Sequence, residues 1–397
     1  PAIGNARFGD LLMIDGVVRS DVFGPHDAGD EQLAHLVVHP DFLAPVDHQI
    51  AVPQNVHDDR RSVQRHALRP VHAARALCGG LGAEIGDARW IDGVVEHRVQ
   101  RRLAAKDVGQ AEKLLQLVTI NFWQTDRFVQ VHTEFYEAKG WLGSLWKSTV
   151  ESSRQLLGQQ AMEINYEIYM PKENVLKLRN RFGNVIVPTL TQPMDVDVEH
   201  GTLKMGDVPA NSQVHAAYGD ARIKSIADAH VRFTFADVTI DKAGRLTWYG
   251  KTNDVRIGEV EELHLVESLK DEFQIESIGQ LQGNSTFSNL YITLCKGKVV
   301  LNSKFGSLTV RQLSPYVSQV RLQGDHVDYE LQFPASDGYQ LELTNAKPKG
   351  LRLPLEKVVM KEEVYLDDLT LLEATLGNPN STKTITIPRN AAQVTAL

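Results

Sequence analysis

A repeating pattern of apolar positions runs from residue 182 to residue 310. Its anchor residues, spaced by 17 or 18 positions, are Phe182, His200, Tyr218, Phe235, Thr252, Lys270, Phe287 and Phe305. The residues three and five positions after every anchor are apolar, sixteen positions in all. With 42% apolar residues in the chain, such agreement would arise by chance about once in a million trials. The spacing therefore indicates an internal structural repeat.

Each repeat predicts a short β-strand whose third and fifth positions point inward and whose fourth points outward. A unit of this length cannot bury its apolar face alone, so the units must stack, with neighbouring strands ~4.8 Å apart. We therefore predict an all-β fold, a β-solenoid in which each repeat makes one coil. Glycines directly after four anchors (Gly183, Gly201, Gly219 and Gly306) are expected to provide the tight-turn conformation. The alternative is a large antiparallel sandwich or barrel, which also uses short, evenly spaced strands.

Alternating segments on both sides of the repeat extend the predicted β-structure. Residues 106–171 contain three strand candidates, 117–124, 127–138 and 161–171, and a short helical candidate at 111–117. The polar segment 140–160 between them carries Trp141 and Trp146, either an exposed aromatic platform for a carbohydrate or buried residues. We assign the solenoid repeats to residues 172–345 and a capping region, which protects the open end of the stack, to 346–397.

Residues 1–105 differ from the rest of the chain in composition. They contain no Lys, Thr or Tyr, but eight of the 14 His and 11 of the 23 Arg. Neither helical nor strand periodicity persists in them. We expect a poorly structured Ala/Arg/His-rich segment, which is either not an evolved domain, for example an out-of-frame translation, or a genuine but unusual one. His35 and His39 have helical spacing, but Pro40 ends any helix there and no third metal ligand sits at a recognisable spacing.

Charge and cysteine content exclude several classes of function. The net charge of -8 argues against a nucleic-acid partner, because binding to phosphates requires an excess of Lys and Arg. Cys78 and Cys295 are too few and too far apart for a disulfide framework or a cysteine zinc site. No window is apolar for the ~18 residues of a membrane span, and no secretory signal pattern follows Pro1. Since the chain starts without an initiator Met, we expect a fragment of a longer protein.

Residues 106–397 resemble a family of exported bacterial β-solenoid proteins described as adhesin-like and of unknown function. The resemblance lies in the segment 162–188, in the Tyr-Gly or Phe-Gly turns at 218–219 and 305–306, and in the closing segment 376–387. It implies a right-handed stack of short strands, location in the periplasm or at the cell surface, and no established enzymatic activity. Residues 1–105 depart from the family, which has a signal sequence and an opening strand unit there.

The position two residues after each anchor carries a carboxylate in four consecutive coils: Asp220, Asp237, Asp254 and Glu272. Such a column could bind Ca²⁺ or a glycan, or it could be a solvated turn position where Asp is favoured. No catalytic, metal-site or cofactor motif is found. We predict a non-catalytic envelope solenoid, an adhesive or scaffolding module for a cell-surface protein or glycan. The alternative is a glycan-binding or carbohydrate-active β-helix that uses this column and Trp141 or Trp146.

Overall fold

The computed structural model describes residues 11–18, 33–40, 74–76, 83–92, 95–103, 118–124, 128–135, 162–333, 338–344, 351–352, 358–366, 369–376, 382–387 and 391–396. This part of the chain is all-β, and its core is a parallel β-solenoid, as the repeat predicts. The chain divides into two compact units, Pro1–Met205 and Gly206–Leu397. The boundaries expected at 105, 171 and 345 stay predictions.

The first unit contains short strands that lead into the first parallel coils. Its strands are β1 (Leu11–Val18), β2 (Leu33–Pro40), β3 (Ala74–Ala76), β4 (Ala83–Asp92), β5 (Val95–Leu103), β6 (Val118–Gln124), β7 (Phe128–Phe135), β8 (Met162–Pro171), β9 (Val175–Val187) and β10 (Met194–Glu199), and the division falls within β11 (Leu203–Val208). Strands β3, β4, β5, β8 and β2 pair antiparallel in that order. Strand β9 pairs in parallel with β10 and β11, with Val185 opposite Leu203.

The three strand candidates at 117–124, 127–138 and 161–171 are confirmed as β6, β7 and β8. The helical candidate at 111–117 and the segment 140–160 with Trp141 and Trp146 lie outside the described residues. Of residues 1–105, only the segments that form β1 to β5 are described. The hypothesis about the origin of this segment therefore stays a prediction. His35 and His39 lie on strand β2 and not on a helix.

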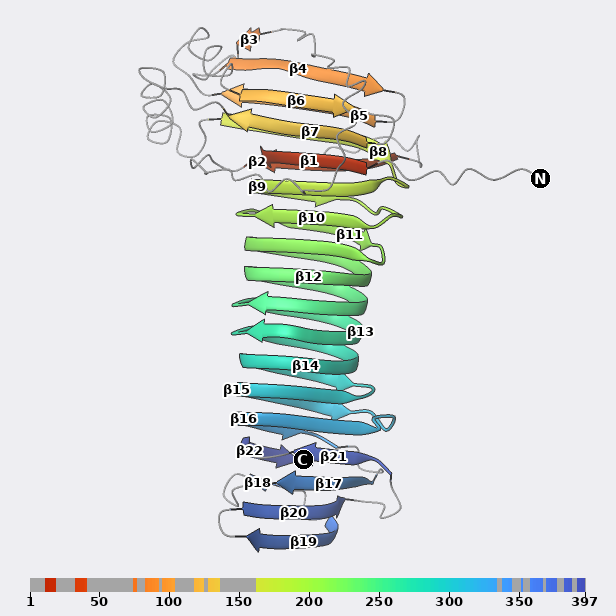
Figure 1. The fold of residues 1–397 in the computed structure, drawn as a ribbon, viewed down its shortest axis with the longest axis vertical. Coiled ribbons are helices and arrows are strands. Elements are labelled where there is room, and N and C mark those ends of the chain that lie inside the picture. Colours follow the sequence, from red (N-terminus) through yellow and green to blue (C-terminus); the bar gives the residue numbers. More distant parts are fainter. Residues whose placement is uncertain are drawn as a thin grey trace, which may run out of the picture. The chain divides into compact units, whose positions relative to one another are not determined.

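The second unit is a stack of parallel coils (Figure 1). Its strands are β12 (Ser212–Lys251), β13 (Asp254–Leu269), β14 (Glu272–Cys295), β15 (Val299–Leu313), β16 (Gln319–Leu331), β17 (Tyr339–Thr344), β18 (Leu351–Arg352), β19 (Val358–Leu366), β20 (Leu369–Leu376), β21 (Thr384–Ile387) and β22 (Ala391–Ala396). Val238 lies opposite Val255, and Val255 opposite Phe273, so each coil is offset from the next by one sequence repeat. The step from Leu308 to Tyr329 is longer than a repeat.

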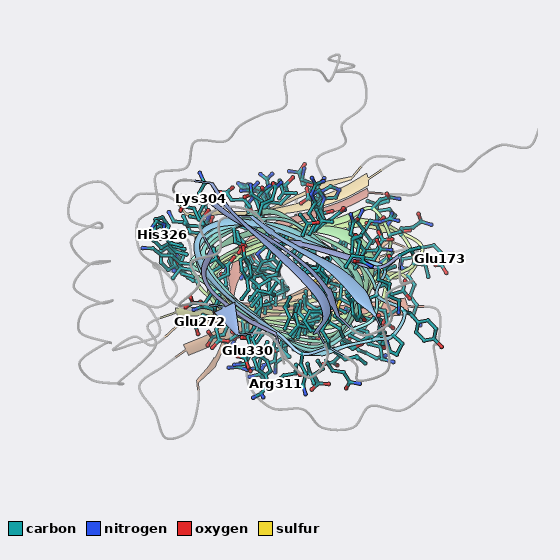
Figure 2. All side chains as sticks on the ribbon, turned by 90° about the horizontal axis from the view of Figure 1, so that it is seen from below. Glu173, Glu272, Lys304, Arg311, His326 and Glu330 are labelled. Carbon is teal, nitrogen blue, oxygen red and sulfur yellow. The ribbon has the colours of Figure 1, made fainter. Side chains whose placement is uncertain are left out.

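The interior of the coils is built from the predicted apolar columns. All sixteen positions three and five residues after the anchors are buried, at 6% exposure or less. Within the second unit the fifth-position column contains Ile223, Ile240, Ile257, Ile275, Ile292 and Val310. Burying one Ile side chain stabilises a fold by about 1.5–3 kcal/mol, so each member of this column contributes to the stability of the stack. Figure 2 shows the charged side chains that surround this interior.

The anchors themselves form a corner with left-handed backbone. Every anchor from His200 to Phe305 has φ between 50° and 59°, and His326 continues the series with φ 56°. The expectation that the following glycines provide this conformation is wrong for Gly201 and Gly219, whose φ is not positive; the preceding His200 and Tyr218 adopt it instead. Gly201 has a different role, since a Cβ there would lie 1.8 Å from the carbonyl oxygen of Gly183.

Candidate functional site

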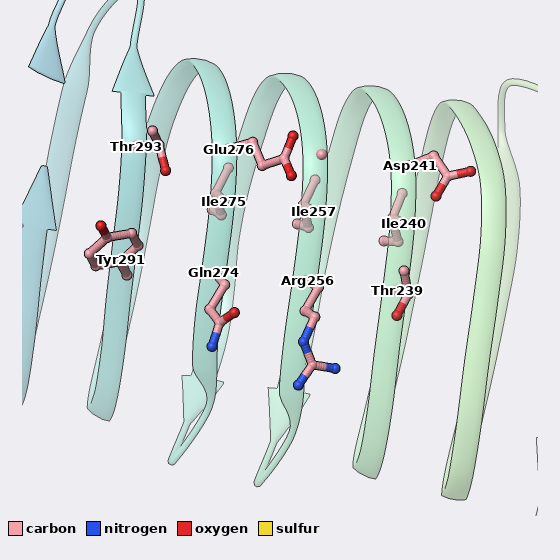
Figure 3. Close-up of a pocket in the computed structure, with 11 residues that line it drawn as sticks. Thr239, Ile240, Asp241, Arg256, Ile257, Gln274, Ile275, Glu276, Tyr291 and Thr293 are labelled. Carbon is pink, nitrogen blue, oxygen red and sulfur yellow. The ribbon is translucent and has the colours of Figure 1, made fainter. Parts of the chain in front are cut away.

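An open hollow of about 800 Å³ lies on the outward face of four consecutive coils of the second unit. It is formed by the strand segments that follow the left-handed corner. It is also lined by Ile240, Ile257 and Ile275, whose side chains are buried in the coil interior. Figure 3 shows the side chains that line it. The outward side chains among them come from the fourth and sixth positions after the anchors, because these alternate with the inward third and fifth.

The lining is polar and mostly exposed. Its fourth-position column contains Thr239, Arg256, Gln274 and Tyr291, and its sixth-position column contains Asp241, Gly258, Glu276 and Thr293. Gly258 creates the depression, since it places no side chain between Asp241 and Glu276. A Cβ at Gly258 would lie 2.6 Å from the carbonyl oxygen of Asp241, so the backbone itself keeps this position free of a side chain.

The predicted acidic column runs beside the hollow. Asp237 lies opposite Asp254, and Asp254 opposite Glu272, so three of the four carboxylates stand in register. Asp220 precedes Asp237 by one sequence repeat. Viewed along the stack, Glu272 lies on the same outer edge as Glu330 and Arg311 (Figure 2). The second, fourth and sixth positions after an anchor point to the same side of an extended strand, so the column belongs to the face that carries the hollow.

Arg256 links the acidic column to the hollow. Its Nη2 lies 3.2 Å from Oδ2 of Asp254, and its side chain also lines the hollow. The other oxygen of Asp254, Oδ1, is buried and has no hydrogen-bond partner among the described residues. Within the described segments, no group of three or more His, Cys, Asp or Glu side chains is placed to hold a metal ion. A role of the column in binding a ligand or Ca²⁺ stays a prediction.

Tyr291 is an exposed aromatic residue at the end of the hollow. Tyr291 is 39% exposed to solvent. Arg311 donates a hydrogen bond from Nε to the Tyr291 hydroxyl at 2.9 Å, and its guanidinium carbon lies 5.7 Å from the ring centroid. This contact raises the pKa of Arg311 and fixes the orientation of the ring. The sequence analysis did not identify Tyr291 as a candidate binding residue. The feature that could have identified it is an aromatic residue at the outward fourth position after the anchor Phe287.

Exposed aromatic residues also line the left-handed corner, but they stack on each other. The ring centroids of Tyr218 and Phe235 are 5.5 Å apart with an interplanar angle of 13°. Those of Phe287 and Phe305 are 4.8 Å apart at 7°, and His326 continues this stack at 5.4 Å. Because most ring faces cover one another, the corner offers mainly ring edges to a ligand. The ring of Tyr291 in the hollow pairs with the guanidinium of Arg311 instead of with another aromatic ring.

Charged residues further along the coils neutralise one another. Arg245 bridges Asp228 and Glu262 on the two adjacent coils, at 3.0 Å each, and hydrogen bonding to Glu262 is the main reason that the pKa of Arg245 is raised. Lys296 lies 2.8 Å from Glu259 and lowers the pKa of that carboxyl. These charged groups form ion pairs with each other. The hollow is therefore a better candidate than this part of the surface for binding a ligand.

A polar network is buried inside the stack behind the corner. Asp271 is fully buried, and its carboxylate accepts hydrogen bonds from Trp248, Ser268 and both the backbone and side-chain nitrogens of Asn253. Burial raises the pKa of Asp271, an effect that the hydrogen bonds of Ser268, Trp248 and Asn253 oppose. Because the network is closed to solvent, its role is structural.

Cys295 is excluded as a nucleophile. It is buried, and desolvation raises the pKa of its thiol to about 11, so the reactive thiolate is scarce at neutral pH. Cys78 lies outside the described residues.

No protein-family model, no curated protein and no solved structure gives a significant match to the chain. The described residues contain no helix long and apolar enough to cross a membrane. The architecture and the chemistry of the hollow are therefore the basis for assigning a function.

Proposed function

We propose that this protein is a non-catalytic, adhesive binding module of the bacterial cell envelope, which holds an extended partner along the outward face that carries the hollow. The observation that carries the proposal is the hollow itself, which crosses four coils and is lined by an arginine, a glutamine, two carboxylates and a tyrosine. The envelope location rests on the resemblance of residues 106–397 to exported adhesin-like solenoids.

The coil geometry suits a linear partner. Neighbouring coils repeat every ~4.8 Å, so equivalent outward positions offer a polymer a regular series of polar contacts. Individually weak contacts add up when one partner engages several of them. The acidic column of Asp220, Asp237, Asp254 and Glu272 runs parallel to the hollow and extends the same face.

A glycan is the second candidate, a more specific one, and the exposed ring of Tyr291 favours it. Arg256 and Gln274 occupy neighbouring coils in register. Planar guanidinium and amide groups present paired hydrogen-bonding atoms, which match the adjacent hydroxyls of a sugar. Together with a stacking aromatic residue they form the combination of apolar surface and a few oriented polar groups that is typical of ligand sites.

The test uses fluorescently labelled full-length protein on Gram-negative cells and on a glycan array. We expect Tyr291→Ala and Gln274→Ala each to weaken binding about tenfold or more. Tyr316→Ala and Gln280→Ala are matched controls, since both residues are exposed, Tyr316 by 87%, and neither lines the hollow. Asp237→Ala and Asp254→Ala measure the contribution of the acidic column.

Three results discriminate the candidates. Binding to cells and array, lost in both hollow variants, supports the glycan version. Binding to cells that survives enzymatic removal of surface polysaccharide, and is lost in the hollow variants, indicates a protein partner. Absence of binding to cells and array, or equal binding by all variants, would refute the role of the hollow.

A further inference from the structure

The last coil of the stack is out of sequence order. Strands β21 and β22, at the end of the chain, both pair in parallel with β16. On their other edge they pair in parallel with β17 and β18, which precede them in sequence. Figure 1 shows β21 and β22 between β16 and the coil of β17 and β18. The chain thus leaves one coil position open after β16 and fills it with its C-terminal strands.

The inserted strands are held by specific contacts. Thr384 donates its backbone N–H to the carbonyl of Ser318 at 3.4 Å, and the carbonyl of Lys383 accepts from Gln340 at 2.7 Å. Ile385 is fully buried. The ammonium of Lys383 donates to the carbonyl of Pro315 and lies 5.4 Å from the ring centroid of Tyr339. These contacts specify the position and register of β21.

These contacts join β21 to parts of the chain that are distant in sequence, and β19 and β20 lie between β18 and β21 along the chain. The same contacts would form equally well if the strands came from another copy of the chain, because domain swapping exchanges identical interactions. Only the tether between β20, which ends at Leu376, and β21, which begins at Thr384, distinguishes the two cases. The closed form is favoured by proximity, and its advantage falls as protein concentration rises.

We propose that β21 and β22 form an exchangeable pair of strands that inserts between β16 and β17–β18 of a second copy of this chain. The segment that fills the position between β16 and β17–β18 thus comes from the C-terminus of a second copy of the same protein. The exchange would link two molecules through their last coils without any new interface, and it is independent of the proposed ligand in the hollow.

Cysteine cross-linking of full-length chains tests this exchange. Arg321 and Thr386 are direct partners on β16 and β21, and both side chains are at least partly solvent-exposed. Parallel neighbours lie ~4.8 Å apart, within the range of Cα distances that a disulfide spans. In a background with Cys78→Ser and Cys295→Ser, Arg321→Cys is placed on a chain with one tag and Thr386→Cys on a chain with another.

We expect the two chains, mixed at high concentration under mild oxidation, to form a covalent heterodimer. The double variant on one chain should close an internal disulfide and remain a monomer. Arg256→Cys mixed with Thr386→Cys is the matched control and should not cross-link, since β13 pairs with β12 and β14 instead of β21. Gln319→Cys with Thr384→Cys, a second pair in register, provides the same test if the first variants fold poorly.

A disulfide that forms within one chain but never between chains, for both pairs, would overturn the proposal. So would failure of both pairs to form the internal disulfide, because the inserted strand would then not lie beside β16. A heterodimer from either pair, absent from the control, supports it.

Discussion

The indole Nε1 of Trp248 donates a hydrogen bond of 3.1 Å to Oδ2 of Asp271, and both side chains are fully buried. Ser268 donates to the same oxygen at 2.8 Å. Asn253 donates its backbone and side-chain N–H groups to Oδ1, at 3.0 Å and 2.8 Å. The solenoid interior, otherwise mainly apolar, therefore contains a carboxylate whose two oxygens each accept two hydrogen bonds.

Ser268→Ala should reveal the strength of this network. The substitution removes a donor to a buried carboxylate with little change of volume, and we expect it to lower the free energy of unfolding by about 1.5–3 kcal/mol. Ser285→Ala is the matched control, because buried Ser285 donates to the neutral hydroxyl of Ser303 at 2.8 Å; its cost should be about 1 kcal/mol. Urea denaturation at neutral pH measures both, and equal losses would contradict a stronger hydrogen bond to the buried carboxyl of Asp271 than to the hydroxyl of Ser303.

Asp271 should make stability depend on pH. Its pKa is raised in the folded protein, so the folded state keeps the proton at pH values where the unfolded chain, with an ordinary pKa of about 3.9, has lost it. The stabilisation from this group is full below pH ~3.9 and is lost as pH rises through the folded pKa. The difference in unfolding free energy between the native protein and Asp271→Asn should therefore shrink over that interval. A constant difference would argue against a raised pKa.

Thr252 occupies a strained position whose relief should stabilise the fold. It has φ 59°, a left-handed conformation that costs an L-residue roughly 1–2 kcal/mol and is especially unfavourable for β-branched side chains. Asn tolerates this region, so Thr252→Asn should raise the free energy of unfolding by about 0.5–1 kcal/mol. Thr247→Asn, on the extended part of β12, should instead destabilise, since Asn is disfavoured in strands. Thermal unfolding of both variants checks the sign of each change.

Gly306→Ala should be among the most damaging single substitutions in the stack. Gly306 has φ 132°, and a Cβ there would lie 2.1 Å from the carbonyl oxygen of Ser288 on the previous coil. We expect a loss of about 2–4 kcal/mol in unfolding free energy. Ala236→Gly, at the equivalent position of another coil, should cost about 1 kcal/mol because its φ is not positive. Urea denaturation compares the two, and comparable losses would show that the clash is relieved by a small backbone shift.

The coil interior was predictable because a strand with one buried face has apolar residues at every second position. Ile240, Ile257 and Ile275 each point inward, and a register shifted by one residue would place them in water. The left-handed corner was not predictable in the same way. Phe235 and Lys270 carry no preference for positive φ, so nothing in the residue type marks them; the stacked coils impose the conformation.

The hollow and the inserted coil could not be predicted from the sequence, for different reasons. Polar residues such as Gln274 and Glu276 are the ordinary composition of any solvated strand face, and only Gly258 hinted at a depression. The placement of Thr384–Ile387 beside β16 is a matter of topology between segments far apart in the chain. Local periodicity identifies the strand but does not say which neighbour it joins.

The buried network around Asp271 also determines which coil pairs with which. The apolar columns are so similar that a slip by a whole coil would still pair Ile240 with an isoleucine. Such a slip would separate the Asp271 carboxyl group from its donors Asn253 and Trp248 and leave buried polar groups unpaired, at a cost of about 1–3 kcal/mol for each group. A single polar layer in an otherwise apolar interior thus fixes the register of the coils on either side of it.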